Sequence, residues 1–281
     1  MRLITLITDF GTRDWFVGTM KGVILGIQSR AVIVDLTHEI DGSEVRAGAF
    51  ALMASYSFFS KSTVHVAVID PGVGGPRRAM AVQTANYFFI GPDNGVLSFA
   101  LRREQIKSIH ALENEKYFLK PVSRTFHGRD IFAPVAAHLS RGVSIQEFGP
   151  RLKDFVKLAW PRLRIRDGEV QGEIVHVDRF GNLITNIDAE SLRVFGDEPC
   201  EILAKRKRLC FIAPCYGAVR AGRPLAVPGS TGFLEIAVNG ASAAASGGFR
   251  ERTGTPPVRT RIRPHAPTTR CRRIAFLRTP D

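Results

Sequence analysis

The sequence predicts an α/β protein with an N-terminal α/β domain, built on a mainly parallel sheet, and a smaller C-terminal β-barrel domain. In residues 1–160, short apolar runs alternate with longer stretches of helical apolar spacing, which is typical of alternating strands and helices. In residues 161–245, short β-like runs follow one another between Gly, Pro and Asp residues, which favours a small barrel. A chain of 281 residues, 44% of them hydrophobic, is large enough to form both cores.

Five strands and three helices are expected in the first domain. The strands are apolar runs, several of them continuous enough to be buried on both faces, at residues 3–8, 31–36, 64–69, 79–83 and 87–90. Apolar residues at helical spacing predict helices at residues 15–27, 43–57 and 131–140.

The second domain is expected to hold six strands, at residues 173–178, 183–187, 200–203, 209–212, 224–227 and 233–238. The pattern changes at Trp160, so we place the domain boundary at about residue 160. A further change follows residue 245, because residues 246–281 hold nine Arg against Glu251 and Asp281 and account for +7 of the +13 formal net charge. This Arg-, Pro- and Thr-rich tail has little apolar pattern, so we expect it to be disordered or to result from a shifted reading frame.

Composition also indicates which partners and which cellular compartment to expect. The residues before the tail carry only +6, an ordinary basic surface, so we do not expect nucleic acid as a partner. No apolar run reaches the roughly 18 residues of a membrane span, and the N-terminus lacks a signal-peptide pattern. The four cysteines form no CxxC pair and are expected to be reduced thiols. Together these observations predict a soluble, cytoplasmic protein with no membrane partner.

Acidic side chains follow apolar runs at three places in the first domain, namely Asp9, Asp35 and Asp70. Because the carboxyl ends of parallel strands meet at one edge of a sheet, we expect these acids to share the edge where open α/β sheets bind ligands. A single acid at a strand end is more often a turn residue, but Asp70 is followed by the glycine-rich residues 72–75 and by Arg77. This loop lacks the spacing of a phosphate-binding loop, so we interpret it as a close approach of backbone to a ligand.

His127 stands in the segment RTFHGRD, directly before a predicted helix. A single histidine is more often structural than catalytic, but its charged neighbours Arg129 and Asp130 could hold and tune it. In the second domain, the segment DRFGNLITN at 178–186 is consistent with a hairpin with an Asn-rich turn. Alternatively, Phe180 stacks on a flat ring and Asn182 reads its hydrogen-bonding edge, with Tyr216 and the turn at 229–233 completing the wall.

Six motifs stand in the order of one known family: ITDFGTRDWFVGTMKG at 7–22, DPGVGGPRR at 70–78, GPDNGVL at 91–97, TFHGRDIFAPVAAHL at 125–139, DRFGNLITNI at 178–187 and GSTGFLEIAVNG at 229–240. From about residue 2 to 245 the chain resembles the S-adenosylmethionine hydroxide adenosyltransferases, hydrolases that release adenosine and methionine and are related to fluorinating and chlorinating adenosyl-halogenases. The resemblance implies an α/β domain followed by a β-barrel. It also implies a homotrimer, with active sites between the first domain of one subunit and the second domain of its neighbour.

The family's catalytic Asp-Arg-His set falls on Asp70, Arg77 and His127. The halogenases carry aromatic residues at the positions of Asp70 and His127 and a serine at Gly128, so this chain has the hydroxide pattern at all three positions. The resemblance also implies substrate contacts: the ribose diol would bind Asp9, and the methionine ammonium would bind Asp14 and Asp178. Adenine would be framed by Phe180, Asn182, Tyr216 and the backbone near Gly240. The methionine carboxylate would bind Ser230; the halogenases bind it with an arginine at the position where this chain has Thr231.

This resemblance implies hydrolysis of S-adenosyl-L-methionine by in-line attack of water or hydroxide on C5′ of the ribose. Methionine leaves a sulfonium as a neutral thioether and needs no general acid, so the enzyme's task is positioning and electrostatics. Asp70 and His127 can orient and deprotonate the water, while Arg77 stabilises Asp70 or hydroxide. No cofactor or metal is required.

Three alternatives stay open. The first is halide-dependent adenosyl transfer, against which Asp70 and His127 argue. The second is a metallohydrolase with metal ligands drawn from Asp9, Asp35, His38, Asp70 and His127. The third is a non-catalytic nucleic-acid-binding protein that uses the basic tail.

Overall fold

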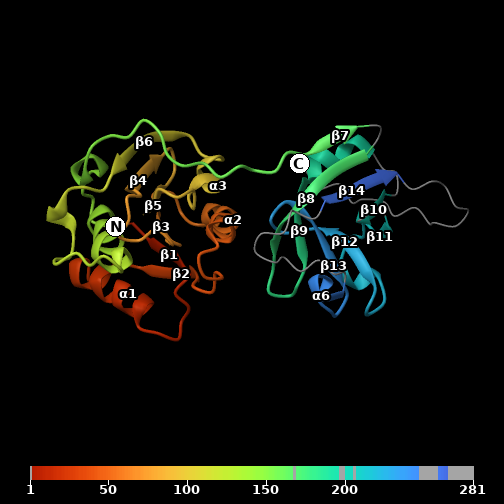
Figure 1. Ribbon diagram of the computed structural model, residues 1–281, viewed down its shortest axis with the longest axis horizontal. Coiled ribbons are helices and arrows are strands. Elements are labelled where there is room, and N and C mark those ends of the chain that lie inside the picture. Colours follow the sequence, from red (N-terminus) through yellow and green to blue (C-terminus); the bar gives the residue numbers. More distant parts are fainter. Residues whose placement is uncertain (1, 167–168, 196–199, 205–206, 247–258, 265–281) are drawn as a thin grey trace, which may run out of the picture. The chain divides into compact units, whose positions relative to one another are not determined.

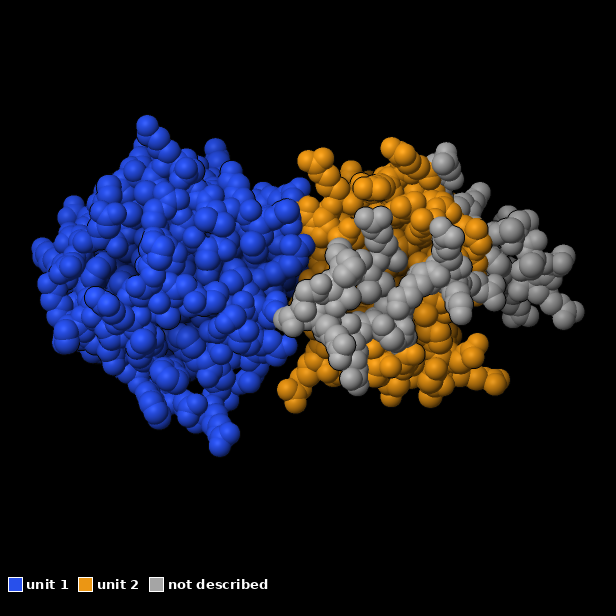
Figure 2. All heavy atoms as spheres, in the orientation of Figure 1, with its two compact units in different colours: residues 1–159 blue, residues 160–281 orange. Residues whose placement is uncertain are grey.

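The computed structural model describes residues 2–166, 169–195, 200–204, 207–246 and 259–264. The chain divides into two compact units, residues 1–159 (unit 1) and 160–281 (unit 2), which Figure 2 colours separately. Each unit has its own hydrophobic core and is described by itself. Within the described ranges, no helix is long and apolar enough to cross a membrane.

Unit 1 is built on a six-stranded sheet in the order β2-β1-β3-β5-β4-β6 (Figure 1). Its strands are β1 (Ile4–Thr8), β2 (Ile33–Thr37), β3 (Val64–Val68), β4 (Ala79–Thr84), β5 (Phe88–Pro92) and β6 (Ile106–Ala111). The first four strands of this order pair in parallel, and β4 runs antiparallel to both β5 and β6. This confirms the predicted α/β class. The sequence did not predict β6, an edge strand whose first half is only partly buried and therefore lacks a continuous apolar run.

Helices cover both faces of this sheet. The longer ones are α1 (Phe16–Ile27), α2 (Val45–Ser55) and α4 (Ala133–Ser140), and α3 (Ser98–Leu101) is a single turn. Met20 of α1 and Val135 of α4 share one core with Leu6 of β1, whereas Leu52 of α2 shares another core with Ile7. Successive side chains of β1 therefore enter different cores, which explains why this strand holds no charged residue and is buried on both faces.

Short helical turns connect the larger elements of unit 1. They are the 3-10 turns η1 (Tyr56–Phe58), η2 (Glu115–Tyr117) and η4 (Ile145–Phe148), and a π-helical turn, η3 (Gly128–Phe132). The π-helical turn runs directly into α4, so the predicted helix at 131–140 begins earlier, immediately after His127.

Unit 2 is an antiparallel sheet in the order β11-β10-β14-β8-β9-β13-β12, with β7 paired to β8. Its strands are β7 (Arg164–Arg166), β8 (Glu169–Val177), β9 (Leu183–Asp188), β10 (Cys200–Ala204), β11 (Lys207–Phe211), β12 (Pro224–Pro228), β13 (Phe233–Val238) and β14 (Arg259–Pro264). Its short helices are α5 (Ala189–Leu192), η5 (Arg193–Phe195), η6 (Tyr216–Ala218) and α6 (Ala243–Ser246). A parallel bridge between Ile212 and Ala226 brings the two ends of the sheet together, so the barrel is nearly closed, as predicted.

Strand β14 lies inside the tail that we expected to be disordered or to result from a shifted reading frame, and for these six residues the expectation of disorder is wrong. Thr260 and Ile262 are fully buried in the barrel, while Arg261 and Arg263 are exposed. Arg263 Nε donates to Oε1 of Glu201, its partner on the neighbouring strand β10, at 2.6 Å. The alternation of charged and barrel-facing residues is a strand pattern that the average composition of the tail conceals. Residues 247–258 and 265–281 lie outside the described ranges.

Candidate active site

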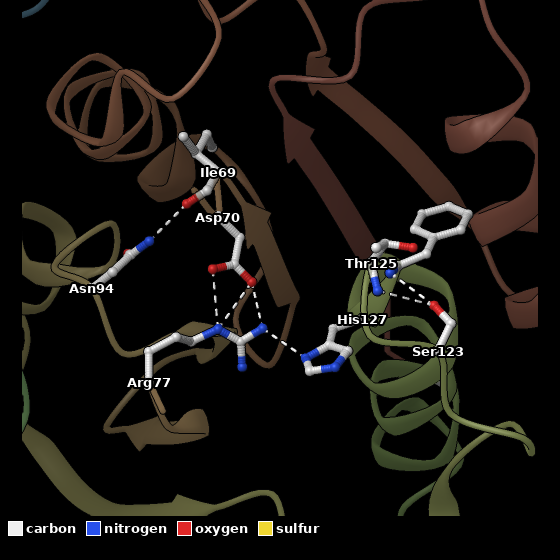
Figure 3. A network of polar contacts seen from close by, with 8 residues as sticks. Ile69, Asp70, Arg77, Asn94, Ser123, Thr125 and His127 are labelled. Atoms are coloured by element: carbon white, nitrogen blue, oxygen red, sulfur yellow. Dashed lines mark hydrogen bonds and ion pairs between the residues drawn. The ribbon is translucent and has the colours of Figure 1, made fainter. Parts of the chain in front are cut away.

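Asp70, Arg77 and His127 are in direct contact in unit 1 (Figure 3). Arg77 Nε donates to both Asp70 oxygens at 3.0 Å, and Arg77 Nη2 contacts both Asp70 Oδ2 and His127 Nδ1, the latter at 2.8 Å. The side chains of Asp70 and Arg77 are only 4% and 11% exposed. The guanidinium plane therefore bridges a carboxylate and an imidazole, which a compact ammonium could not do with the same geometry.

The hydrogen bond to Arg77 fixes the proton of His127. A guanidinium can only donate, so His127 Nδ1 accepts and the neutral ring carries its proton on Nε2. Burial, followed by the charge of Arg77, lowers the pKa of His127 below its ordinary value, while the charges of Asp70 and Asp130 oppose this shift. Neutral His127 therefore offers an N–H donor at Nε2.

Three segments of unit 1 hold this trio in place. Asp70 follows β3, whose end is fixed by a hydrogen bond of 2.8 Å from Asn94 Nδ2 to the carbonyl of Ile69 (Figure 3). Gly74 has a φ of +74°, and a Cβ at this position would lie 2.1 Å from the carbonyl oxygen of Arg124. The glycine-rich loop therefore packs closely on the segment that leads to His127, and only glycine fits there.

The His127 turn is anchored by a buried carboxylate. Asp130 is 0% exposed, its Oδ2 accepts from Ser123 N at 2.8 Å, and its Oδ1 accepts from Arg129 Nε at 2.6 Å. Ser123 Oγ in turn accepts from the backbone N–H of Thr125 and of Phe126 (Figure 3). The charged neighbours of His127 in the sequence thus hold its turn, as the motif suggested.

Asp9 follows β1, the strand next to β3, so Asp9 and Asp70 lie at the same edge of the sheet. The ring of Phe10 packs 5.8 Å from that of Phe126, which joins the Asp9 loop to the His127 turn. Asp9 Oδ2 accepts from the backbone N–H of Ser43 at 3.1 Å. The side chain of Asp14, in the same loop, is exposed.

Three of the predicted residues of unit 2, Asp178, Phe180 and Asn182, share the turn between β8 and β9. The backbone N–H and Nδ2 of Asn182 donate to the two Asp178 oxygens at 2.8 and 2.9 Å, which fixes both side chains. Gly181 has a φ of +80° in this turn, and the Phe180 ring beside it is 77% exposed. A flat aromatic surface therefore stands next to an amide that has a carbonyl oxygen and a second N–H to offer.

Tyr216 is held by a carboxylate that the sequence analysis missed. Its hydroxyl donates to Glu235 Oε2 at 2.7 Å, and Glu235 is only 6% exposed. Burial, then the contact with Glu235 and the charge of Asp178, raise the pKa of Tyr216 to about 12. Glu235 is the single acid in the apolar strand sequence FLEIAV, and that isolation was the available signal.

The remaining predicted contacts lie in turns on either side of β13. Ser230 is exposed in the turn before this strand, and Gly240 is exposed after it with a φ of +74°. Thr231 Oγ1 is buried and has no hydrogen-bond partner among the described residues. A cavity of about 190 Å³ in unit 2 includes none of the predicted residues in its lining.

In the described part of the chain, no group of three or more His, Cys, Asp and Glu side chains is arranged to hold a metal ion. Asp35, a residue of the alternative metal set, instead contacts Lys21 Nζ and His38 Nε2.

Comparison with known proteins identifies the family. Residues 4–149 match the SAM hydroxide adenosyltransferase N-terminal domain, and residues 172–254 match the C-terminal domain. Two curated relatives are named (R)-S-adenosyl-L-methionine hydrolase. That of Methanocaldococcus jannaschii is 40% identical over 68% of this chain and 68% of its own length, and that of Thermus thermophilus is 34% identical over 89% and 97%.

More distant curated relatives are named fluorinase, among them one from Actinoplanes sp. that is 28% identical over 69% of this chain and 74% of its own length. A crystal structure of an uncharacterised conserved protein from Thermotoga maritima superposes with a TM-score of 0.86 at 36% identity, covering 92% of this chain and 99% of that one. Both domain matches and the identity to the hydrolases lead to one conclusion: this chain belongs to the SAM hydroxide adenosyltransferase family.

Proposed function

We propose that this protein hydrolyses S-adenosyl-L-methionine to adenosine and L-methionine by attack of water or hydroxide on C5′ of the ribose. The observation that carries the proposal is the bridge that Arg77 makes between Asp70 and His127 at the carboxyl edge of the sheet. The names of the relatives at 34–40% identity support the same reaction.

The chemistry requires an aligned nucleophile more than an acid. Methionine leaves the cationic substrate as a neutral thioether, so no proton has to be delivered to the leaving group. Water has to lie opposite the C5′–S bond and lose a proton as the C–O bond forms. Each water consumed therefore yields one adenosine hydroxyl, one methionine and one proton.

We assign a separate task to each of the three residues. His127 donates from Nε2 to the oxygen of the attacking water and so fixes its position. Asp70 accepts the proton of that water through Oδ1, which takes one hydrogen bond from Arg77 and keeps a lone pair, whereas Oδ2 accepts two. Arg77 balances the Asp70 charge and holds both partners in one plane.

Substrate contacts are proposed on both units. Asp9 receives the ribose diol, and Asp14 and Asp178 receive the methionine ammonium. Ser230 meets the methionine carboxylate. The adenine ring is framed by Phe180, Asn182, Tyr216 and the backbone near Gly240. The exposed Phe180 ring and the fixed Asn182 amide support this assignment, because stacking and an amide edge suit a purine.

We further propose that the enzyme is a cytoplasmic homotrimer that needs no cofactor or metal. The resemblance to the family supports the trimer, and the free thiols of Cys210 and Cys215 suit a reducing compartment. Mass photometry at three times the chain mass would support the trimer, and a monomer at working concentration would contradict it. Unchanged activity in the presence of a chelator would support metal independence.

The reaction is tested by incubating the purified full chain with each sulfonium epimer of S-adenosylmethionine in ¹⁸O-labelled water. Chromatography and mass spectrometry should show adenosine that carries the label at the 5′ oxygen. Unlabelled adenosine would exclude attack at C5′, and the absence of adenosine would contradict the proposal. A 5′-halogenated product formed in chloride or fluoride would support the halogenase alternative instead.

A further inference from the structure

Four residues of unit 1, Thr8, His38, Asp35 and Lys21, form a chain of polar contacts next to the loop that carries Asp9. Thr8 Oγ1 is 2.9 Å from His38 Nδ1, His38 Nε2 is 3.1 Å from Asp35 Oδ1, and Asp35 Oδ2 is 2.5 Å from Lys21 Nζ. Thr8 is 0% exposed and His38 is 4% exposed. The chain thus links the last residue of β1 to β2, to the loop after β2 and to α1.

A hydroxyl, an imidazole and a carboxylate in this order resemble a nucleophilic triad, but the surroundings of Thr8 exclude that role. A nucleophile has to reach its substrate, and Thr8 is fully buried. Its Oγ1 already accepts the backbone N–H of Phe10 at 3.2 Å. A second contact, with His38 Nδ1, fixes the Thr8 side chain, while His38 Nε2 faces the Asp35 carboxylate.

Thr8 and His38 also contact the residues on either side of Asp9. Thr8 precedes it, and the hydrogen bond from Phe10 N to Thr8 Oγ1 closes a turn around it. The carbonyl of His38 accepts from Gly11 N at 2.7 Å, so this histidine contacts the loop on both sides of Asp9.

The loop after β2 also reaches the Asp9 carboxylate itself. Ser43 N donates to Asp9 Oδ2 at 3.1 Å, with Ser43 at a φ of +68°. This backbone conformation is uncommon for serine and persists only where the surroundings impose it. One carboxylate oxygen is thereby engaged, whereas Oδ1 accepts no hydrogen bond from the residues that the structure describes.

We infer that His38, held by Asp35 and Lys21, is a positioning residue that orients Asp9 toward the substrate diol. This inference rests on the proposed function. Partial burial of Asp35 raises its pKa, but the contacts with Lys21 and His38 outweigh this effect and lower the pKa below its ordinary value. Asp35 therefore keeps its charge beside Lys21, and Thr8 and His38 contact the Asp9 loop.

The same sheet offers a matched control. Thr5 Oγ1 lies 2.8 Å from His65 Nδ1, and both residues are 0% exposed. Thr5 is three residues before Thr8 on β1 and so faces the other side of the sheet, where His65 packs against Tyr56. Replacing either threonine by valine removes one buried hydroxyl from one histidine, but only Thr8 adjoins Asp9.

The test compares Thr8→Val, Thr5→Val and Thr8→Ser in the full chain. Thr8→Val should raise KM for adenosine release about tenfold, as expected for one lost hydrogen bond, with kcat within about twofold of the parent. Thr8→Ser should restore KM, and Thr5→Val should leave both constants unchanged. If Thr8→Val fails to fold, the partly exposed Asp35→Asn replaces it, with the same direction expected. Equal KM values in folded Thr8→Val and Thr5→Val would overturn the inference.

A double-mutant cycle with Asp9→Asn tests whether the effect passes through Asp9. Adenosine binding, measured by calorimetry, should weaken in Thr8→Val but should not weaken further when Thr8→Val is added to Asp9→Asn. Additive effects would overturn the inference even if hydrolysis is normal. Adenosine binding that shows the expected cycle without hydrolysis would overturn the proposed function alone, and absence of both binding and turnover would overturn both.

Discussion

Replacing Arg77 by lysine separates the charge of this residue from its geometry. Arg77 contacts Asp70 through two nitrogens and His127 through one of them. Lysine keeps the positive charge, but its compact ammonium cannot hold the carboxylate in a bidentate contact and also reach His127 Nδ1. The variant should therefore retain the pairing with Asp70 and lose the bridge.

The expected magnitude follows from the lost contact. A hydrogen bond to a charged group contributes about 1.5–3 kcal/mol, and each 1.4 kcal/mol corresponds to about a tenfold change in rate. Loss of the bridge should therefore lower kcat roughly 10- to 150-fold. Because we assign Arg77 no contact with the substrate, KM should change little, so kcat and kcat/KM should fall together.

Initial rates of adenosine release, with the thermal midpoint as a folding check, measure this effect. The neighbouring Arg78 provides the control, since it also pairs with carboxylates, Asp93 at 2.6 Å and Asp154 at 2.9 Å, but is 40% exposed and contacts none of the proposed catalytic residues. Arg78→Lys should leave kcat within about twofold, as for most exposed ion pairs. Full activity in folded Arg77→Lys, or an equal loss in Arg78→Lys, would refute the bridging role.

Three further outcomes follow from the structure. Ile262→Asp puts a charge into the barrel and should lower the free energy of unfolding by about 3 kcal/mol or more, whereas Arg261→Ser should change it by at most about 0.5 kcal/mol; urea denaturation measures both. Tyr216→Phe leaves Glu235 buried without its donor and should raise KM about fivefold or more, while Glu235→Gln keeps an acceptor and should raise it less; equal values would contradict this. Burial lowers the pKa of His65 to about 3, so unfolding takes up a proton between pH 6.5 and 3. The free energy of unfolding should therefore fall by about 1.4 kcal/mol for each pH unit below pH 6.5 and should not depend on His65 above that pH. Replacing His65 by Gln should reduce this slope.

The sequence predicted the elements whose local pattern matches their final environment. Strand β1 is apolar except for two threonines and enters a core on each face, so composition and structure agree there. Strand β14 was missed because its pattern covers six residues within a 36-residue tail whose average composition resembles disorder. Its partners β8 and β10 come from distant parts of the chain, and no local rule shows that the barrel has room for it.

In the candidate site, too, residue types can be predicted from the sequence, whereas contacts between distant segments cannot. The types and order of Asp70, Arg77 and His127 are visible in the sequence, but the direction of the hydrogen bond to Nδ1, and with it the position of the His127 proton, follows only from the contact with Arg77. The isolation of Glu235 in an apolar strand signals a buried acid, but its partner Tyr216 lies 19 residues away and is shown only by the fold. Ser43 was missed because its contribution depends on a backbone φ of +68°, which residue type does not encode.

The charge balance of the trio also bears on the choice of nucleophile. With His127 neutral, the negative charge of Asp70 and the positive charge of Arg77 offset each other within hydrogen-bond distance. A halide entering this site would meet a carboxylate and no uncompensated cation. The cost of removing its hydration shell would therefore not be offset by an attractive interaction with the protein. In the proposed reaction, water needs no such cation, because it accepts from His127 Nε2 and donates to Asp70. In the proposed reaction, the carboxylate that takes up the proton is thus also the group that disfavours the competing anion.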